Sequence, residues 1–182
     1  MRIGSQGGFR KARRKPSKAA PTKLPTLFRR QTLLVASIDN SLRLYRDILG
    51  LEVCFDNIVP IGGKGLPTGI FDAKARLVFL KSYEDHMVGV VGLLEYLDKP
   101  VPQRSGGARR KLTLGDSVLL LNTTSVAERM EKIKRSLPDV YIQSEGSVDV
   151  YPSATGGTMT VLGNSLFDAD GHFIELNEVV AS

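Results

Sequence analysis

The stretch that decides the fold is "LFDADGHFIEL", residues 166–176, near the C-terminal end of the chain. Its Asp-Ala-Asp-Gly segment predicts a turn, because Asp tolerates left-handed backbone conformations and Gly accepts a positive φ without steric cost. The residues that follow alternate, which predicts a strand with Phe173 and Glu175 on one face and Ile174 and Leu176 on the other. A carboxylate near the centre of a strand is costly unless it is solvated, paired or bound to a cation. Glu175 is therefore a candidate ligand, a candidate catalytic group, or a carboxylate that lines a wet groove.

The same order of elements occurs twice along the chain. In the first half a strand precedes a helix with Asp39 or Asn40 as N-cap, and in the second half a strand precedes a helix capped by Ser125. Three strands follow each helix, and the last strand of each half carries one glutamate, which makes Glu95 the expected counterpart of Glu175. A duplicated unit that cannot close its own core implies that the two halves pair. The expected elements are strands at 30–38, 51–57, 75–82, 87–97, 116–124, 140–147, 158–168 and 172–179 and helices at 39–50 and 125–137.

Residues 30–180 resemble the vicinal oxygen chelate superfamily, which includes glyoxalase I, extradiol dioxygenases and bleomycin-resistance proteins. "VASIDNSLRLYRDILGLEV" (35–53) looks like the first strand, helix and second strand of that family. "LFDADGHFIELNE" (166–178) looks like its closing hairpin, with Asp-Ala-Asp-Gly where the family usually has Asp-Pro-Asp-Gly. The resemblance implies one α+β domain of two βαβββ modules, residues 30–98 and 112–180, joined by a linker at 99–111. The modules are expected to form a curved eight-stranded mixed sheet around a concave cavity.

The resemblance also assigns candidate site residues. The metal site of this family takes one ligand from the first strand and one, usually a carboxylate, from the last strand of each module. Glu95 and Glu175 are therefore the expected catalytic and metal-binding residues, and Gln31 is a third candidate ligand. In both cases the flanking apolar residues, such as Leu94 and Tyr96, lie on the opposite face of the strand, which allows the acids to face the cavity.

The first-strand positions depart from the family pattern, which supplies His or Gln there. The match falls on Arg30 in the first module, and on Ser117 or Val118 in the second. An Arg30 side chain that faces the cavity would neutralise one glutamate, act as an anion clamp and make a metal unnecessary. Together with Arg30, the expected substrate-binding residues are Tyr96, His172 and Phe173.

The donor set limits the metal and the chemistry. Two carboxylates, at most one amide and no imidazole favour Mg²⁺ or Mn²⁺ over Zn²⁺ or Fe²⁺. A site that binds no metal is the alternative. A reaction of the glyoxalase I type needs a Lewis acid and a carboxylate base, a role that fits Glu175 or Glu95. Extradiol cleavage is disfavoured, because His86 and His172 do not supply its two-His, one-carboxylate iron site.

These residues lead to two main functional predictions. The first is a glyoxalase-like protein that acts on a small molecule in the inter-module cavity by metal-assisted lyase or isomerase chemistry. The alternative is a non-catalytic protein that binds a small molecule or sequesters an antibiotic, as bleomycin-resistance proteins do. A weaker hypothesis is an RNA- or assembly-associated protein built on a retired enzyme scaffold. The sequence also allows a homodimer, in which a second copy would complete the open sheet edges and the rims of the cavity.

The charge of the chain is distributed unevenly. The 182 residues carry a net charge of +6, but residues 1–30 hold ten basic residues and no acid, which leaves 15 basic against 19 acidic residues. Residues 1–29 are predicted to be a disordered basic tail. The alternatives are an organelle-targeting peptide or an arm that contacts an anionic partner such as RNA or lipid. No apolar run has the length of a membrane span, and the single cysteine, Cys54, excludes an intrachain disulfide, so a cytoplasmic location is expected.

Overall fold

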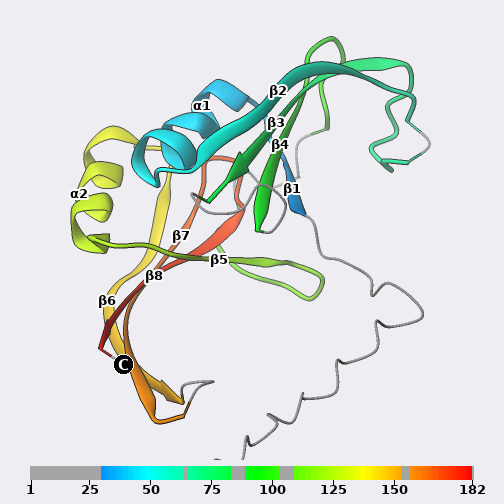
Figure 1. Cartoon of the computed structure of the whole chain (residues 1–182). Coiled ribbons are helices and arrows are strands. Elements are labelled where there is room, and N and C mark those ends of the chain that lie inside the picture. The colour runs from blue at the N-terminus through cyan, green and yellow to red at the C-terminus, as the bar shows by residue number, and fades with distance from the viewer. Residues whose placement is uncertain (1–29, 64, 83–88, 103–108, 153–155, 182) are drawn as a thin grey trace, which may run out of the picture.

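The computed structural model describes residues 30–63, 65–82, 89–102, 109–152 and 156–181 (Figure 1). The predicted tail, residues 1–29, and His86 lie outside the described residues. In the part of the chain that is described, no helix is long and apolar enough to cross a membrane. The elements, in chain order, are β1 (Arg30–Leu34), α1 (Ile38–Leu42), the π-helix η1 (Arg43–Ile48), β2 (Glu52–Ile61), β3 (Ala73–Lys81), β4 (Val90–Tyr96), β5 (Val118–Asn122), α2 (Val126–Ser136), β6 (Tyr141–Pro152), β7 (Thr158–Phe167) and β8 (Phe173–Ala181).

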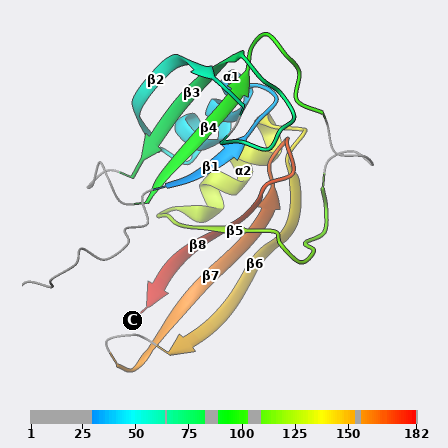
Figure 2. The ribbon, with the colours of Figure 1, turned by 90° about the vertical axis from the view of Figure 1, so that its right-hand side faces the viewer.

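The predicted fold class is confirmed: a strand, a helical segment and three further strands occur twice. The eight strands are divided between two four-stranded sheets, with the orders β1-β4-β3-β2 and β5-β8-β7-β6. In each sheet the first strand pairs in parallel with the last strand of its module, and the other neighbours are antiparallel. The two sheets are therefore mixed and have the same topology (Figure 2).

A single hydrophobic cluster joins the two modules. Val91 and Leu93 of β4 belong to it, together with Ile174 and Leu176 of β8 and the buried side of both helical segments. Helix α2 contributes residues at helical spacing, beginning with Val126, so its apolar stripe faces this cluster. Because the cluster draws on both modules, the two share a hydrophobic core.

The helix N-termini differ from the prediction. Helix α1 begins at Ile38, and its N-cap is Ser37, whose hydroxyl oxygen accepts a hydrogen bond from the Asn40 N–H (3.3 Å). Ser125 does precede α2, but its φ is +56° and its side chain makes no capping hydrogen bond. The predicted N-cap of α1, Asp39 or Asn40, is therefore wrong, whereas Ser125 is the N-cap residue of α2 as predicted, without a capping hydrogen bond from its side chain.

The turn that follows β7 is fastened to the first module by hydrogen bonds. Asp168 Oδ2 accepts from the Tyr45 hydroxyl (2.8 Å), and both residues are buried, with 5% and 0% exposure. Asp170 Oδ1 accepts from the Ala36 N–H (3.1 Å), and His172 Nε2 lies 3.0 Å from the Leu34 carbonyl oxygen. This turn therefore holds the β1–α1 segment and the second sheet together.

The interior of the turn is organised by the same aspartate. Asp168 Oδ1 accepts hydrogen bonds from the N–H groups of Asp170 (3.1 Å) and His172 (2.8 Å). Gly171 has a φ of +84°, and a Cβ atom there would lie 2.7 Å from the Arg109 backbone nitrogen. A side chain at position 171 is therefore excluded both by conformation and by the chain that passes over it.

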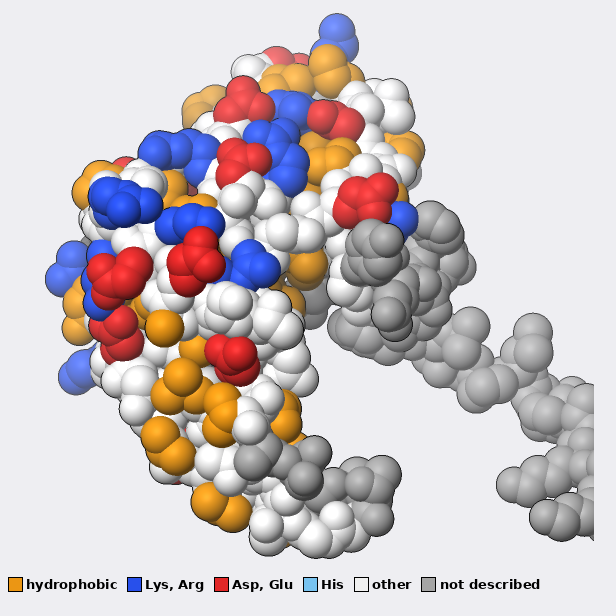
Figure 3. Space-filling model, turned by 60° about the vertical axis from the view of Figure 1, so that its left-hand side comes forward, with side chains coloured by type: hydrophobic (Ala, Val, Ile, Leu, Met, Phe, Trp, Pro, Cys, Tyr) orange, Lys and Arg blue, Asp and Glu red, His pale blue; other side chains and the backbone are white. Residues whose placement is uncertain are grey.

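The helix-bearing side of the molecule carries charges of both signs. Figure 3 shows Lys and Arg side chains interspersed with Asp and Glu on this face. On α2, Lys132 pairs with Glu128 (2.7 Å) and Lys134 pairs with Glu131 (2.8 Å). Such exposed pairs contribute little to stability, but they show that this face is no single-sign patch.

The hydrogen bond between Tyr45 and Asp168 is expected to contribute strongly to stability. Tyr45→Phe leaves a buried carboxylate without its hydroxyl donor, and a hydrogen bond to a charged group contributes about 1.5–3 kcal/mol. We expect the free energy of unfolding, measured by urea denaturation, to fall by about 2 kcal/mol. Tyr151→Phe, at a tyrosine that is 47% exposed, should change it by less than about 0.5 kcal/mol. Equal effects of the two substitutions would contradict this role of Tyr45.

Candidate functional site

The strand registers show which residues of the two modules correspond. Strands β1 and β5 are each five residues long, and each pairs with the first residues of its parallel partner. Gly92 lies opposite Thr32 in the third pair of the first sheet, and Glu175 lies opposite Leu120 in the third pair of the second. Gly92 is therefore the counterpart of Glu175, and the prediction that Glu95 is its counterpart is wrong.

Glu95 corresponds to Glu178, and both bind a helix N-terminus. Glu95 Oε2 accepts a hydrogen bond from the Ile38 N–H (2.8 Å) at the start of α1. The two carboxylate oxygens of Glu178 accept from the N–H groups of Ser125 (3.1 Å) and Val126 (2.9 Å) at the start of α2. Carboxylates are favourable there, because the first N–H groups of a helix have no intrahelical partner and the helix dipole is positive at that end. Glu95 thus has a structural contact rather than a place in the cavity.

The burial of β4 explains why its faces were assigned wrongly. Val91 and Leu93 pack against the helices, so Glu95, which has the same parity, faces the helices too. Leu94 and Tyr96 lie on the other face, where a second apolar cluster covers them. Because both faces of β4 are buried, the apolar neighbours of Glu95 did not identify the cavity side.

Tyr96, a predicted substrate-binding residue, is buried in that second cluster. Its hydroxyl lies 3.1 Å from Thr68 Oγ1, in the loop between β2 and β3. The ring therefore anchors this loop on the first sheet, and the substrate-binding role remains a sequence-based prediction.

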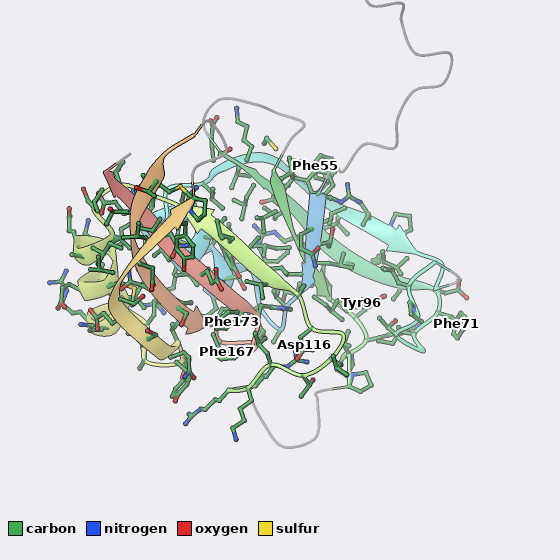
Figure 4. The ribbon with its side chains drawn as sticks, turned by 90° about the horizontal axis from the view of Figure 1, so that it is seen from below. Phe55, Phe71, Tyr96, Asp116, Phe167 and Phe173 are labelled. Atoms are coloured by element: carbon green, nitrogen blue, oxygen red, sulfur yellow. The ribbon has the colours of Figure 1, made fainter. Side chains whose placement is uncertain are left out.

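Glu175 and Phe173 lie on the face of β8 that points away from the helices, since Ile174 and Leu176 are in the shared core. Glu175 is half-buried, and its carboxylate makes no hydrogen bond or ion pair with any residue that the structure describes. The Phe173 ring packs on Phe167, with 5.0 Å between the ring centroids (Figure 4). The second sheet thus presents an unpaired carboxylate beside an aromatic pair.

A cavity of about 340 Å³ lies between the two modules. We call it the inter-module pocket. Edge strand β1 forms one wall, and the segment before β5 together with the turn before β8 forms the other. Gln31 and His172 line it, whereas Glu95, Glu175, Arg30, Tyr96 and Phe173 do not. The complete lining consists of Gln31, Thr32, Leu33, Leu34, Arg109, Gly115, Asp116, Ser117, Asp170, Gly171 and His172.

Two aspartates of the inter-module pocket have shifted pKa values. The Thr113 N–H, assisted by the Thr113 hydroxyl and the Arg109 guanidinium, lowers the pKa of Asp116. Partial burial raises the pKa of Asp170, the Ala36 N–H opposes this rise, and the nearby charge of Asp168 adds to it. Asp116 is thus fixed as the anionic partner of Arg109, with which it forms an ion pair.

Other polar groups of the inter-module pocket are open to a ligand. His172 Nε2 faces a carbonyl oxygen, which only accepts, so Nε2 carries the proton of the neutral ring and Nδ1 is an acceptor. The Gln31 amide and the Ser117 hydroxyl make no hydrogen bond within the described part of the chain. Nothing in the local sequence pattern predicted Asp116, Asp170 or Thr32 as lining residues, and Arg109 falls in a segment that was interpreted as a linker.

The residues present do not fit a metal centre of the kind that the resemblance implied. The first-strand positions that the resemblance gave, Arg30 and Val118, correspond to each other by register, and so do the last-strand positions Gly92 and Glu175. Only one of the four can donate a carboxylate oxygen. Within the described ranges, no three His, Cys, Asp or Glu side chains are placed to hold one metal ion.

The comparisons with known proteins agree with the fold. No protein-family model matches the sequence, and no curated protein matches it. A glyoxalase family protein from Bacillus cereus superposes with a TM-score of 0.68 at 16% identity, over 90% of this chain and 100% of that chain. The trypanothione-dependent glyoxalase I of Leishmania major gives a TM-score of 0.52 at 19% identity, over 85% and 87%. At such identities the likeness shows the fold alone: the chain has the vicinal oxygen chelate fold.

The three glutamates are expected to respond differently to substitution. Glu95→Ala and Glu178→Ala each remove an acceptor from a helix N-terminus, so each should lower the free energy of unfolding by about 1 kcal/mol in urea denaturation. Glu175→Ala removes no intramolecular hydrogen bond and should change it by less than about 0.5 kcal/mol. If Glu175→Ala were the most destabilising of the three, the assignment of capping and free glutamates would be wrong.

Proposed function

We propose that this protein of the vicinal oxygen chelate fold binds a small molecule in the inter-module pocket, without a metal centre. The observation that carries the proposal is the pocket itself. Its volume of about 340 Å³ lies within the range of about 300–1,000 Å³ that is usual for small-molecule sites. Both modules contribute walls, so a bound ligand would contact the first and the second half of the duplicated fold.

The polar groups of the inter-module pocket define what the ligand must offer. The Gln31 amide donates and accepts, the Ser117 hydroxyl does the same, and His172 Nδ1 accepts. Leu33 and Leu34 supply apolar surface on the β1 side. A ligand with a polar end of mixed donors and acceptors and an apolar remainder therefore matches this lining.

The residues at the expected ligand positions favour binding without a metal. Glu175 is the one carboxylate at the four expected ligand positions, and Arg30 places a permanent positive charge at another of them. Two like charges repel, so a guanidinium at a ligand position disfavours a divalent cation nearby. The alternative that the sequence left open, binding without catalysis, is thus the one that the arrangement supports best.

Filling the inter-module pocket should abolish binding. We expect fragments of a small polar library to shift the NMR signals of Gln31, Ser117 and His172 in the wild type. Ser117→Phe places a ring in the cavity and should weaken such fragments at least about tenfold. The control is Thr158→Phe, at an exposed position at the start of β7, and should leave affinity unchanged. Fragment binding that shifts other regions only, or that survives Ser117→Phe, would contradict the proposal.

A metal-assisted lyase or isomerase is the second candidate, and the half-buried, unpaired carboxylate of Glu175 is the observation that favours it. Its side chain would be one ligand or the base of such a reaction. Glu95, the other predicted catalytic residue and metal ligand, is engaged at α1. Gln31, the third predicted ligand, lines the inter-module pocket, whose lining does not include Glu175.

Metal analysis separates the two candidates. For protein purified without chelator, we expect no stoichiometric metal, and a thermal shift below about 1 °C with Mg²⁺, Mn²⁺, Ni²⁺ or Zn²⁺ at concentrations well above a micromolar Kd. Stoichiometric metal that is lost on Glu175→Gln would favour the metalloenzyme and overturn the metal-free proposal. The matched control for that substitution is Glu145→Gln, at an exposed glutamate of β6 that pairs with Lys134.

Three further predictions from the sequence are not tested by the structure and stay predictions. They are a homodimer, an anionic partner for residues 1–29, and a cytoplasmic location. Antibiotic sequestration of the bleomycin-resistance type is one form that binding in the inter-module pocket would take, and the identity of the ligand decides it.

A further inference from the structure

We propose that the ligand of the inter-module pocket carries an oxyanion, a carboxylate in the first instance, which is bound by the Arg30 guanidinium above Gly92. This inference rests on the proposed function and names the class of ligand. It also assigns a planar, unsaturated group to that ligand, next to the anion.

Arg30 lies on the face of the first sheet that points away from the helices. Leu33 and Val35 of the same strand region are in the shared core, so the residues of opposite parity, Arg30 and Thr32, project from the other face. On that face a row runs across all four strands. It consists of Thr32, Gly92, Phe79 and Phe55.

Gly92 contributes no side chain to this row, and the Thr32 side chain packs closely over it. A Cβ atom at position 92 would lie 2.8 Å from Thr32 Oγ1, so glycine permits this close approach and any other residue would displace Thr32. Arg30 reaches into the row from the neighbouring position. Its Nε donates to Thr32 Oγ1 (3.1 Å), and its Cζ lies 4.3 Å from the centroid of the Phe79 ring. The guanidinium therefore extends from Thr32 to Phe79, across the position of Gly92.

The contacts of Arg30 fix its guanidinium and leave its two terminal nitrogens available. The Nε–H is used by Thr32, and one face of the group lies on the Phe79 ring. Neither Nη atom forms a hydrogen bond or ion pair with a residue in the described ranges. Arg76, by contrast, binds Asp39 (2.7 Å) and Asp56 (2.7 Å) with its terminal nitrogens. Arg30 is held in place without being neutralised.

A guanidinium of this kind matches a carboxylate or phosphate, whose paired oxygens accept its parallel N–H groups. Phe55 and Phe79 stack next to it, with 4.8 Å between ring centroids and an interplanar angle of 24°. Both residues are only partly buried, so they offer aromatic surface to a planar group of the ligand. An aromatic carboxylate combines both features.

Thr32 connects this anion site with the inter-module pocket. Thr32 lines the inter-module pocket, and its hydroxyl oxygen accepts the hydrogen bond from the Arg30 Nε–H. Arg30 is not itself a lining residue, but it is bonded to one, so a ligand that extends from the inter-module pocket past Thr32 would meet its guanidinium.

The experiment compares a charged probe with its neutral counterpart. Benzoate, benzamide and inorganic phosphate are titrated at constant ionic strength against wild type, Arg30→Gln, Arg30→Lys and Arg135→Gln, and binding is followed by NMR. Arg135 is an exposed residue of α2, so its substitution removes the same charge at a distance from the site. We expect benzoate to bind the wild type at least about tenfold more tightly than benzamide. Arg30→Gln should remove that difference, Arg30→Lys should retain part of it, and Arg135→Gln should leave it intact.

The outcomes separate this inference from the proposed function. Equal affinity for benzoate and benzamide, or benzoate binding that survives Arg30→Gln, would overturn the anion site. Equal affinity for phosphate and benzoate would overturn the planar group. If library fragments bind the inter-module pocket but none of these anions does, the proposed function stands and the anion site fails. If neither class binds, both fail.

Discussion

The buried hydrogen bond from the Tyr45 hydroxyl to Asp168 is the interaction on which the arrangement of the two modules depends. The Asp168 carboxylate accepts three hydrogen bonds, one from the first module and two from within its own turn. Burial raises the pKa of Tyr45, and the nearby charge of Asp168 raises it further, so the phenol stays protonated and donates. The same aspartate thus shapes the turn and fastens it to η1, while Asp170 and His172 hold the turn to Ala36 and Leu34. The inter-module pocket follows from this, because its walls are β1 and that turn.

In both modules, a glutamate of the last strand has a structural role. In each module, a carboxylate near the end of the last strand binds the N-terminus of the helix, from Glu95 to Ile38 and from Glu178 to Val126. These contacts join residues 57 and 52 positions apart, and so they tie the beginning of each module to its end. Glu175 has no such task, and its counterpart is Gly92. The symmetry of the fold is thus preserved at the helix caps and broken on the opposite face of the sheets.

The fold could be predicted from the sequence because its determinants are local. The Asp-Ala-Asp-Gly turn and the alternation after it, with the strand–helix pattern at 35–53, identified the architecture and the faces of β8. The site could not be predicted to the same extent. Glu95 was misplaced because β4 is apolar on both faces, so its alternation carries no information about the cavity. The cap of α1 was misassigned because the helix begins before the predicted position, after Ser37, and the carboxylate of Glu178 takes the place of the Ser125 side chain at α2. Asp116 and Asp170 enter the inter-module pocket only through tertiary structure.

At the proposed anion site, Arg30 and Gly92 stand where the resemblance places metal ligands, which would reverse the charge of the site. A carboxylate at position 92 would attract a cation, whereas a glycine there admits the Arg30 guanidinium, held by a hydroxyl and an aromatic ring. A metal ion must be held by carboxylate ligands, whereas the Arg30 guanidinium is attached to the chain and needs none. Its two terminal nitrogens can donate hydrogen bonds to an oxyanion. An arginine stabilises negative charge on a bound oxygen but does not convert water into a nucleophile as a bound divalent metal does. If Arg30 binds the ligand as proposed, this face of the first sheet is therefore better suited to hold an organic anion than to activate one.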